Sequence, residues 1–149
     1  MHAPFHVRRL RPEELDGILK VEQASFGKDA YDRNLFANYL QRDGELFLVV
    51  ERGKEICGYS IAVVRGDRAE LVSIAVDPKS RRKGVGRALL ASTLRRLSRR
   101  GVTRVSLTVR PENEPARALY ESYGFVKWRK VPGYYEDGTD GVRMRRLNR

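Results

Sequence analysis

The spacing of apolar residues divides the chain into helical and extended segments. In two early segments the apolar residues recur at helical spacing, with Pro12 opening the first helix and Asp32 placed to cap the second. Two later segments show the same spacing, and the remaining apolar residues alternate or form short runs typical of strands. The predicted helices span 12–25, 32–43, 84–100 and 113–123, and the predicted strands span 6–10, 46–51, 56–65, 70–76, 105–109, 125–131 and 142–147.

The order and length of these segments predict one small α/β domain. The three extended runs between residues 46 and 76 are separated only by short turns, at 52–54 and 66–67, so they predict an antiparallel meander. A chain of 149 residues can bury one hydrophobic core but is short for two. We therefore expect a single domain over residues 1–149.

Charge and composition narrow the partners. The chain has 30 Lys and Arg against 19 Asp and Glu, a net charge of +11, so we expect anionic partners such as a cofactor with phosphate groups, ribosomal RNA or an acidic protein surface. Apolar runs stay well below the ~20 residues that span a bilayer, and residues 1–11 lack a secretory signal, which predicts a cytoplasmic protein without membrane contact. Cys57 is the only cysteine, so we expect no disulfide within the chain, and Cys57, His2 and His6 have no partners at metal-ligand spacing, so we expect no metal.

A basic, glycine-containing loop follows the fourth predicted strand. Asp77-Pro78 ends this strand, and residues 81–87 then place successive backbone N–H groups at the start of a helix, where the dipole favours an anion. Gly84 and Gly86 would allow a pyrophosphate to approach this backbone closely. The spacing differs from the Walker and dinucleotide-binding motifs. The alternative interpretation is a turn with solvated arginines.

Two motifs at matching separation resemble those of the GNAT acetyltransferases. The first is Val76-x-Pro78 followed by Arg81-x-x-Gly84-x-Gly86, which is similar to the coenzyme A signature of that superfamily. The second runs from Val109-Arg110 through Asn113, Ala116 and Leu119-Tyr120-Glu121 to Gly124-Phe125. Within the superfamily the chain most resembles the RimI-like (ribosomal-protein alanine) N-terminal acetyltransferases, through residues 22–26, 119–122 and 134–144.

The resemblance implies a fold and a cofactor site. The fold would be a mixed, mostly antiparallel sheet, splayed between the fourth and fifth strands and flanked by about four helices, with acetyl-CoA (coenzyme A) in the splay. The cofactor would contact backbone groups of the fourth strand, the basic loop and the last helix. The implied residues are Ile74, Ala75, Val76, Arg81, Arg82, Lys83, Gly84, Val85, Gly86, Arg87, Asn113 and Tyr120.

The resemblance also implies catalytic residues, with one departure. Tyr120 would protonate the leaving thiolate, although a core aromatic is the alternative. In RimI-like enzymes a glutamate on the fifth strand accepts the proton, but here that position is Thr108, which cannot do so. Glu70 matches the catalytic glutamate of the histone-acetylating branch and is the substitute we favour, against the alternative of an ordinary exposed carboxylate. Glu22 and Asp29 are weaker candidates.

The acceptor is predicted to be an N-terminal α-amine. Freeing an α-amine of pKa about 7.7–8.0 at pH 7 costs about 1.2 kcal/mol, whereas freeing a lysine of pKa about 10.4 costs about 4.6 kcal/mol. A site without its usual base therefore favours a protein or peptide N-terminus, bound by a monomer or homodimer along Phe26, Asp29, Tyr134 and Tyr135. The alternatives are acetylation of lysine or a small-molecule amine and, in another class, a basic nucleic-acid- or ribosome-binding module that has lost catalysis.

Overall fold

A computed structural model describes residues 5–27, 32–43, 46–82 and 84–148. These residues form one mixed sheet of seven strands in the order β1-β2-β3-β4-β5-β7-β6. The strands are β1 Phe5–Arg9, β2 Phe47–Arg52, β3 Glu55–Arg65, β4 Arg68–Val76, β5 Arg104–Val109, β6 Val126–Val131 and β7 Gly141–Leu147. All but the β4–β5 pair are antiparallel, which confirms the expected meander and the mostly antiparallel sheet.

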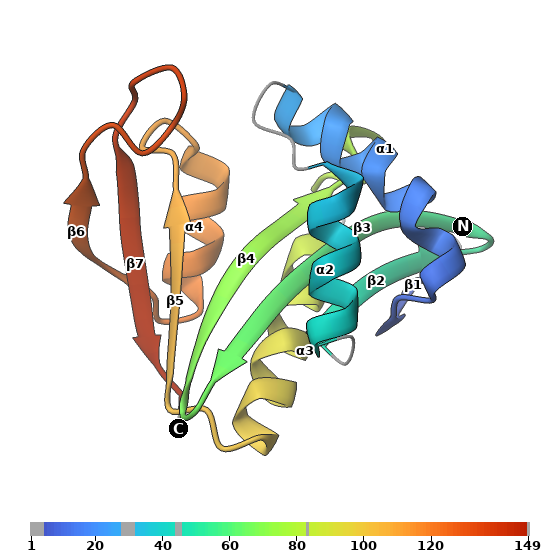
Figure 1. Ribbon diagram of the computed structural model, residues 1–149, viewed down its shortest axis with the longest axis horizontal. Helices are drawn as coiled ribbons and strands as arrows, with labels where there is room; N and C mark the ends of the chain where they lie inside the picture. The colour runs from blue at the N-terminus through green and yellow to red at the C-terminus, as the bar shows by residue number, and fades with distance from the viewer. Residues whose placement is uncertain (1–4, 28–31, 44–45, 83, 149) are drawn as a thin grey trace.

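Four α-helices cover the sheet, two on each face (Figure 1). They are α1 Leu15–Phe26, α2 Arg33–Asp43, α3 Val85–Arg99 and α4 Glu114–Ser122, with short 3-10 turns at Pro12–Glu14 and Pro78–Ser80. The two predicted caps are present, because the Asp32 carboxylate accepts from the Leu35 N–H at 2.9 Å and the Asn113 side chain accepts from the Ala116 N–H at 3.3 Å. None of the helices in the described ranges is long and apolar enough to span a bilayer.

Two layers of apolar side chains hold the helices on the sheet. Under α1 and α2, the ring of Phe36 meets the rings of Phe47 and Tyr59 edge-on, with centroids 5.8 and 5.5 Å away. Under α3, Gly58 lets the helix approach the sheet closely, because a Cβ there would lie 3.2 Å from the side chains of both Leu89 and Val85. The sheet is thus a rigid platform whose strand ends position the site.

The sheet opens between β4 and β5. These parallel strands pair over only three residues, from Arg68 with Arg104 to Glu70 with Ser106, and β5 continues along β7 alone (Figure 1). A bulge in β4 between Leu71 and Ser73 bends the strand at the point where the pairing ends. The expected splay between the fourth and fifth strands is therefore confirmed, and β4 begins two residues earlier than predicted because Arg68 and Ala69 form the parallel pairs.

Candidate active site

The loop before α3 has the geometry of an anion-binding helix start. The first helical hydrogen bond runs from the Ala88 N–H to the Gly84 carbonyl at 3.0 Å, so the N–H groups of residues 85–87 point out of the helix end. Gly84 has a φ of 82° and Arg82 a φ of 65°, a left-handed conformation that costs a non-glycine residue about 1–3 kcal/mol. Arg81, Arg82 and Arg87 are exposed around this end, and Lys83 lies outside the described residues.

Gly86 has a packing reason that the motif alone did not reveal. A Cβ at this position would lie 3.3 Å from Leu119 Cδ2 and 3.8 Å from Val76 Cγ2. The start of α3 therefore packs tightly against α4 and the end of β4, and Gly86 permits that contact. Beside the role that the sequence predicts for both glycines, Gly84 supplies a left-handed backbone conformation and Gly86 permits a close approach between elements.

The end of β4 offers a free strand edge toward the splay. Ile74, Ala75 and Val76 pair with β3 on one side, whereas in the described part of the chain no β5 residue pairs with them on the other. The Val76 carbonyl accepts from Ser25 Oγ at 3.4 Å and from Arg81 Nε at 3.3 Å, which joins the ends of α1, β4 and the basic loop. A strand edge without a neighbouring strand is where an extended ligand can pair with the backbone.

Tyr120 lies on α4 in the core behind the splay. Its side chain is buried, and its ring meets that of Phe125 edge-on at 5.8 Å. Burial raises the pKa of the Tyr120 phenol well above its usual value, and nearby Tyr135 adds to the effect. The hydroxyl keeps its proton at neutral pH, so Tyr120 does not act as a phenolate base.

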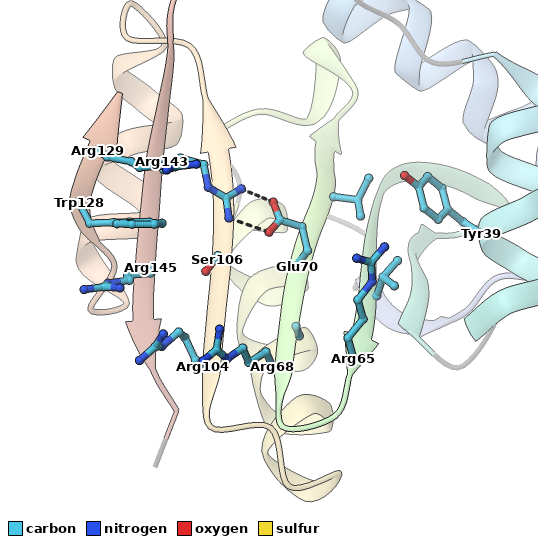
Figure 2. A pocket seen from close by; sticks show the side chains of 13 residues that line it. Tyr39, Arg65, Arg68, Glu70, Arg104, Ser106, Trp128, Arg129, Arg143 and Arg145 are labelled. Atoms are coloured by element: carbon cyan, nitrogen blue, oxygen red, sulfur yellow. Dashed lines mark hydrogen bonds and ion pairs between the residues drawn. The ribbon is translucent and has the colours of Figure 1, made fainter. Parts of the chain in front are cut away.

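Glu70 is held by an arginine that the motifs do not include. Arg143 Nη1 and Nη2 donate to the two oxygens of the Glu70 carboxylate at 2.6 and 3.1 Å (Figure 2). Arg143 Nη1 also donates to Thr108 Oγ1 at 2.9 Å. β4, β5 and β7 therefore meet in one hydrogen-bonded group. The Glu70 side chain is 40% exposed, and a proton acceptor at Glu70 must share its oxygens with Arg143.

A tyrosine pair closes the β7 side of the opening. The rings of Tyr134 and Tyr135 meet edge-on at 4.9 Å, and the Arg110 guanidinium lies 4.0 Å from the centre of the Tyr135 ring. Arg110 also pairs with Asp137 at 3.2 Å, so it anchors the loop between β6 and β7. Gly141 permits this packing, because a Cβ there would lie 2.7 Å from Thr108 Cγ2 and 3.1 Å from Tyr134 Cβ.

Comparisons with known proteins decide the family. The model of the Acetyltransferase (GNAT) family matches residues 13–125, about three quarters of the chain. The chain belongs to this family. The GNAT chain is 35% identical to the ribosomal protein bS18-alanine N-acetyltransferase of Escherichia coli strain K12, over 91% of its length and 89% of the relative. It is 30% identical to an N-alpha-acetyltransferase of Saccharolobus solfataricus, over 95% of its own length and 92% of that relative.

A solved structure agrees with this family and fold. The structure of Ard1 from Thermoplasma volcanium superposes with a TM-score of 0.92 at 27% identity and covers 96% of this chain and 97% of that one. The predicted membership of the GNAT superfamily and the resemblance to RimI-like enzymes are thus confirmed. GNAT acetyltransferases take their acetyl group from acetyl-CoA, which is the cofactor that the two motifs predicted.

The predicted site residues gather around the open end of the splay. The free β4 edge and the start of α3 lie together there, and Tyr120 of α4 and the N-cap residue Asn113 belong to the neighbouring half of the sheet. The end of α1, with half-buried Phe26, and the loop with Tyr134 and Tyr135 flank the opening (Figure 1). Glu22 is buried within α1 with 1% exposure, and Asp29 lies outside the described residues.

Proposed function

We propose that this GNAT enzyme transfers the acetyl group of acetyl-CoA to the N-terminal α-amine of a polypeptide. The observation that carries the proposal is the acceptor side of the sheet, where the usual base is replaced by Thr108 and Glu70 is bound through both oxygens by Arg143. An acceptor that needs little deprotonation suits this arrangement. The N-terminal acetyltransferases among the relatives support the same acceptor class.

The cofactor would be held by backbone more than by side chains. The N–H groups at the start of α3, with Arg81, Arg82 and Arg87, would bind the pyrophosphate, and the β4 edge at 74–76 would bind the pantetheine arm. Acetyl-CoA supplies the activated thioester. A backbone N–H near Val76 would stabilise the oxyanion of the transition state. Tyr120 would return a proton to the departing sulfur, since its buried phenol is protonated at neutral pH.

The acceptor amine would lose its proton with little help from the protein. For an α-amine the neutral form costs about 1.2 kcal/mol at pH 7, about 3.4 kcal/mol less than for a lysine. Thr108 and Glu70, held together by Arg143, would orient a water molecule beside the amine. Glu70 is thereby proposed as a residue that acts through this water, not as a base in direct contact with the amine.

The physiological setting belongs to the same proposal. The acceptor would be a protein N-terminus met in the cytoplasm, with the ribosome or an acidic protein surface as candidate partners for a chain of net charge +11. The enzyme would act as a monomer or homodimer. Acetylation of lysine or small amines and a role as a catalytically inactive nucleic-acid-binding module are not favoured.

Release of free thiol from acetyl-CoA tests this function. Three acceptors are compared. The first is a peptide whose only amine is its free α-amine. The second is this peptide with its N-terminus blocked and one internal residue replaced by lysine, and the third is a polyamine. We expect fast release with the free α-amine, at least tenfold above the other two. Tyr120→Phe serves as the control variant, because it should bind acetyl-CoA but transfer slowly. Equal or faster release with the lysine peptide would reassign the acceptor.

A further inference from the structure

A basic pocket lies beside Glu70 on the face of the sheet that carries α1 and α2. It has a volume of about 530 Å³ and runs from Tyr39 of α2 across β4 and β5 to Trp128 of β6 (Figure 2). Five different strands contribute arginines to its lining. The six arginines, two of them on β7, are Arg65, Arg68, Arg104, Arg129, Arg143 and Arg145.

The described part of the chain does not neutralise the positive charge of this pocket. Glu70 is the only carboxylate in the lining, and Arg143 already occupies it. Within the described ranges of the chain, none of the other five arginines forms an ion pair with an acidic side chain. A net excess of guanidinium groups around one cavity is an arrangement that binds anions.

One pair of these arginines places two like charges opposite each other. Arg68 and Arg104 are direct partners in the parallel β4–β5 ladder, and both line the pocket. Like charges directly opposite each other on neighbouring strands are destabilising. A sequence keeps such a local conflict chiefly where a functional site needs it, and a bound anion would remove it.

We propose that this pocket is a subsite for an acidic side chain of the acceptor polypeptide, near its third residue. The proposal rests on the function proposed above, which places the acceptor amine beside Glu70 and Thr108. Arg68 precedes Glu70 by two positions along β4, and Arg145 follows Arg143 by two along β7, about 6.6 Å in each case. Because β4 and β7 run in opposite directions, both arginines lie toward the same end of the sheet. Two residues of an extended peptide cover the same distance, so a Glu or Asp at the third position would reach these guanidinium groups.

The surroundings of Trp128 favour a peptide over a nucleic acid. The guanidinium groups of Arg129 and Arg145 lie 4.9 and 4.6 Å from the centre of its ring, and Figure 2 shows the ring between them. Stacking with a base needs an open aromatic face. Two arginines occupy the surroundings of this ring instead, and guanidinium groups bind carboxylates through paired N–H donors.

Peptides that differ only at the third residue test the subsite. With Glu, Gln or Lys at that position, we expect the wild-type kcat/KM to be about tenfold higher for Glu than for Gln, and the preference to shrink as NaCl is added. The double variant Arg68→Gln, Arg145→Gln should reduce the ratio to within about twofold. The matched control is Arg95→Gln, Arg99→Gln, which removes the same charge from exposed positions of α3 on the other face and should keep the ratio.

The outcomes separate the subsite from the proposed function. If the wild type acetylates the Gln and Glu peptides equally well, the subsite is wrong and N-terminal acetylation stands. If no peptide is acetylated, the function is wrong, and binding is judged from the fluorescence of Trp128, the only tryptophan of the chain. An unchanged signal with the Glu peptide overturns the subsite. If a single-stranded oligonucleotide changes the Trp128 fluorescence at a lower concentration than this peptide does, the pocket binds nucleic acid and the peptide subsite is wrong.

Discussion

Replacing Gly141 with alanine would push the tyrosine side of the site away from Thr108. The new Cβ would lie 2.7 Å from Thr108 Cγ2, closer than real Cβ contacts come, and 3.1 Å from both Cβ and Cγ of Tyr134, which is tighter than most such contacts. None of these atoms is the free end of a flexible side chain, since Thr is stiff at χ1 and the Tyr134 atoms lie next to the backbone. We therefore expect β7 and the loop with Tyr134 to move.

The size of the effect follows from this overpacking. Extra volume at a packed position costs about 1–3 kcal/mol, which lowers the melting temperature of a chain of this length by about 2–12 °C. The three heavy atoms nearest to a Cβ at Gly141 belong to Thr108 and Tyr134, and none belongs to the loop before α3. The affinity for acetyl-CoA should therefore persist. KM for an acceptor peptide should rise, because Tyr134 is expected to line the acceptor groove.

Thermal unfolding, calorimetry with acetyl-CoA and steady-state kinetics measure the three consequences. A second substitution sharpens the test: Thr108→Ser removes Cγ2 but keeps the hydroxyl that accepts from Arg143. In the Gly141→Ala background it should recover part of the lost stability, while alone it should not stabilise. An unchanged KM together with a lower affinity for acetyl-CoA would refute the assignment of this loop to the acceptor.

Three further changes test other parts of the site and fold. Tyr120→Phe should keep folding and cofactor affinity while turnover falls by about 10²–10⁴, and equal turnover would reduce Tyr120 to packing. Gly84→Val should abolish acetyl-CoA binding in calorimetry, whereas Gly53→Val, which strains a positive φ in the β2–β3 turn, should not. Arg8 lowers the pKa of Glu14, so this pair stabilises the fold above pH ~4.5, and the stabilisation is lost as the pH falls. Glu14→Gln should therefore flatten the decrease in melting temperature on acidification.

The secondary structure and the cofactor loop could be predicted because their causes are local. Apolar periodicity located every helix and strand to within a few residues, and the caps at Asp32 and Asn113 form the hydrogen bonds that their positions suggested. The splay was predictable only by resemblance to a family. The alternation of apolar and polar residues in β4 and β5 does not indicate that their pairing stops after Glu70.

The acceptor side was less predictable because it depends on strand register. Arg143 lies 73 positions from Glu70 along the chain, and only the placement of β7 beside β5 brings the two together. The same holds for Gly141 beneath Tyr134 and for the basic pocket. The signal that could have indicated Arg143 is the alternation in the last strand, where Arg143 and Arg145 share one face while Val142 and Met144 are buried.

Competition within a single molecule tests N-terminal acetylation most directly. The acceptor is a peptide with a free α-amine and one internal lysine, incubated with enzyme and acetyl-CoA at pH 7, and fragmentation mass spectrometry locates the acetyl group. The deprotonation costs differ by about 3.4 kcal/mol, a factor of roughly 300 in the neutral amine, so acetylation is expected almost entirely on the α-amine. Acetyl groups found mainly on the lysine would contradict the proposed function.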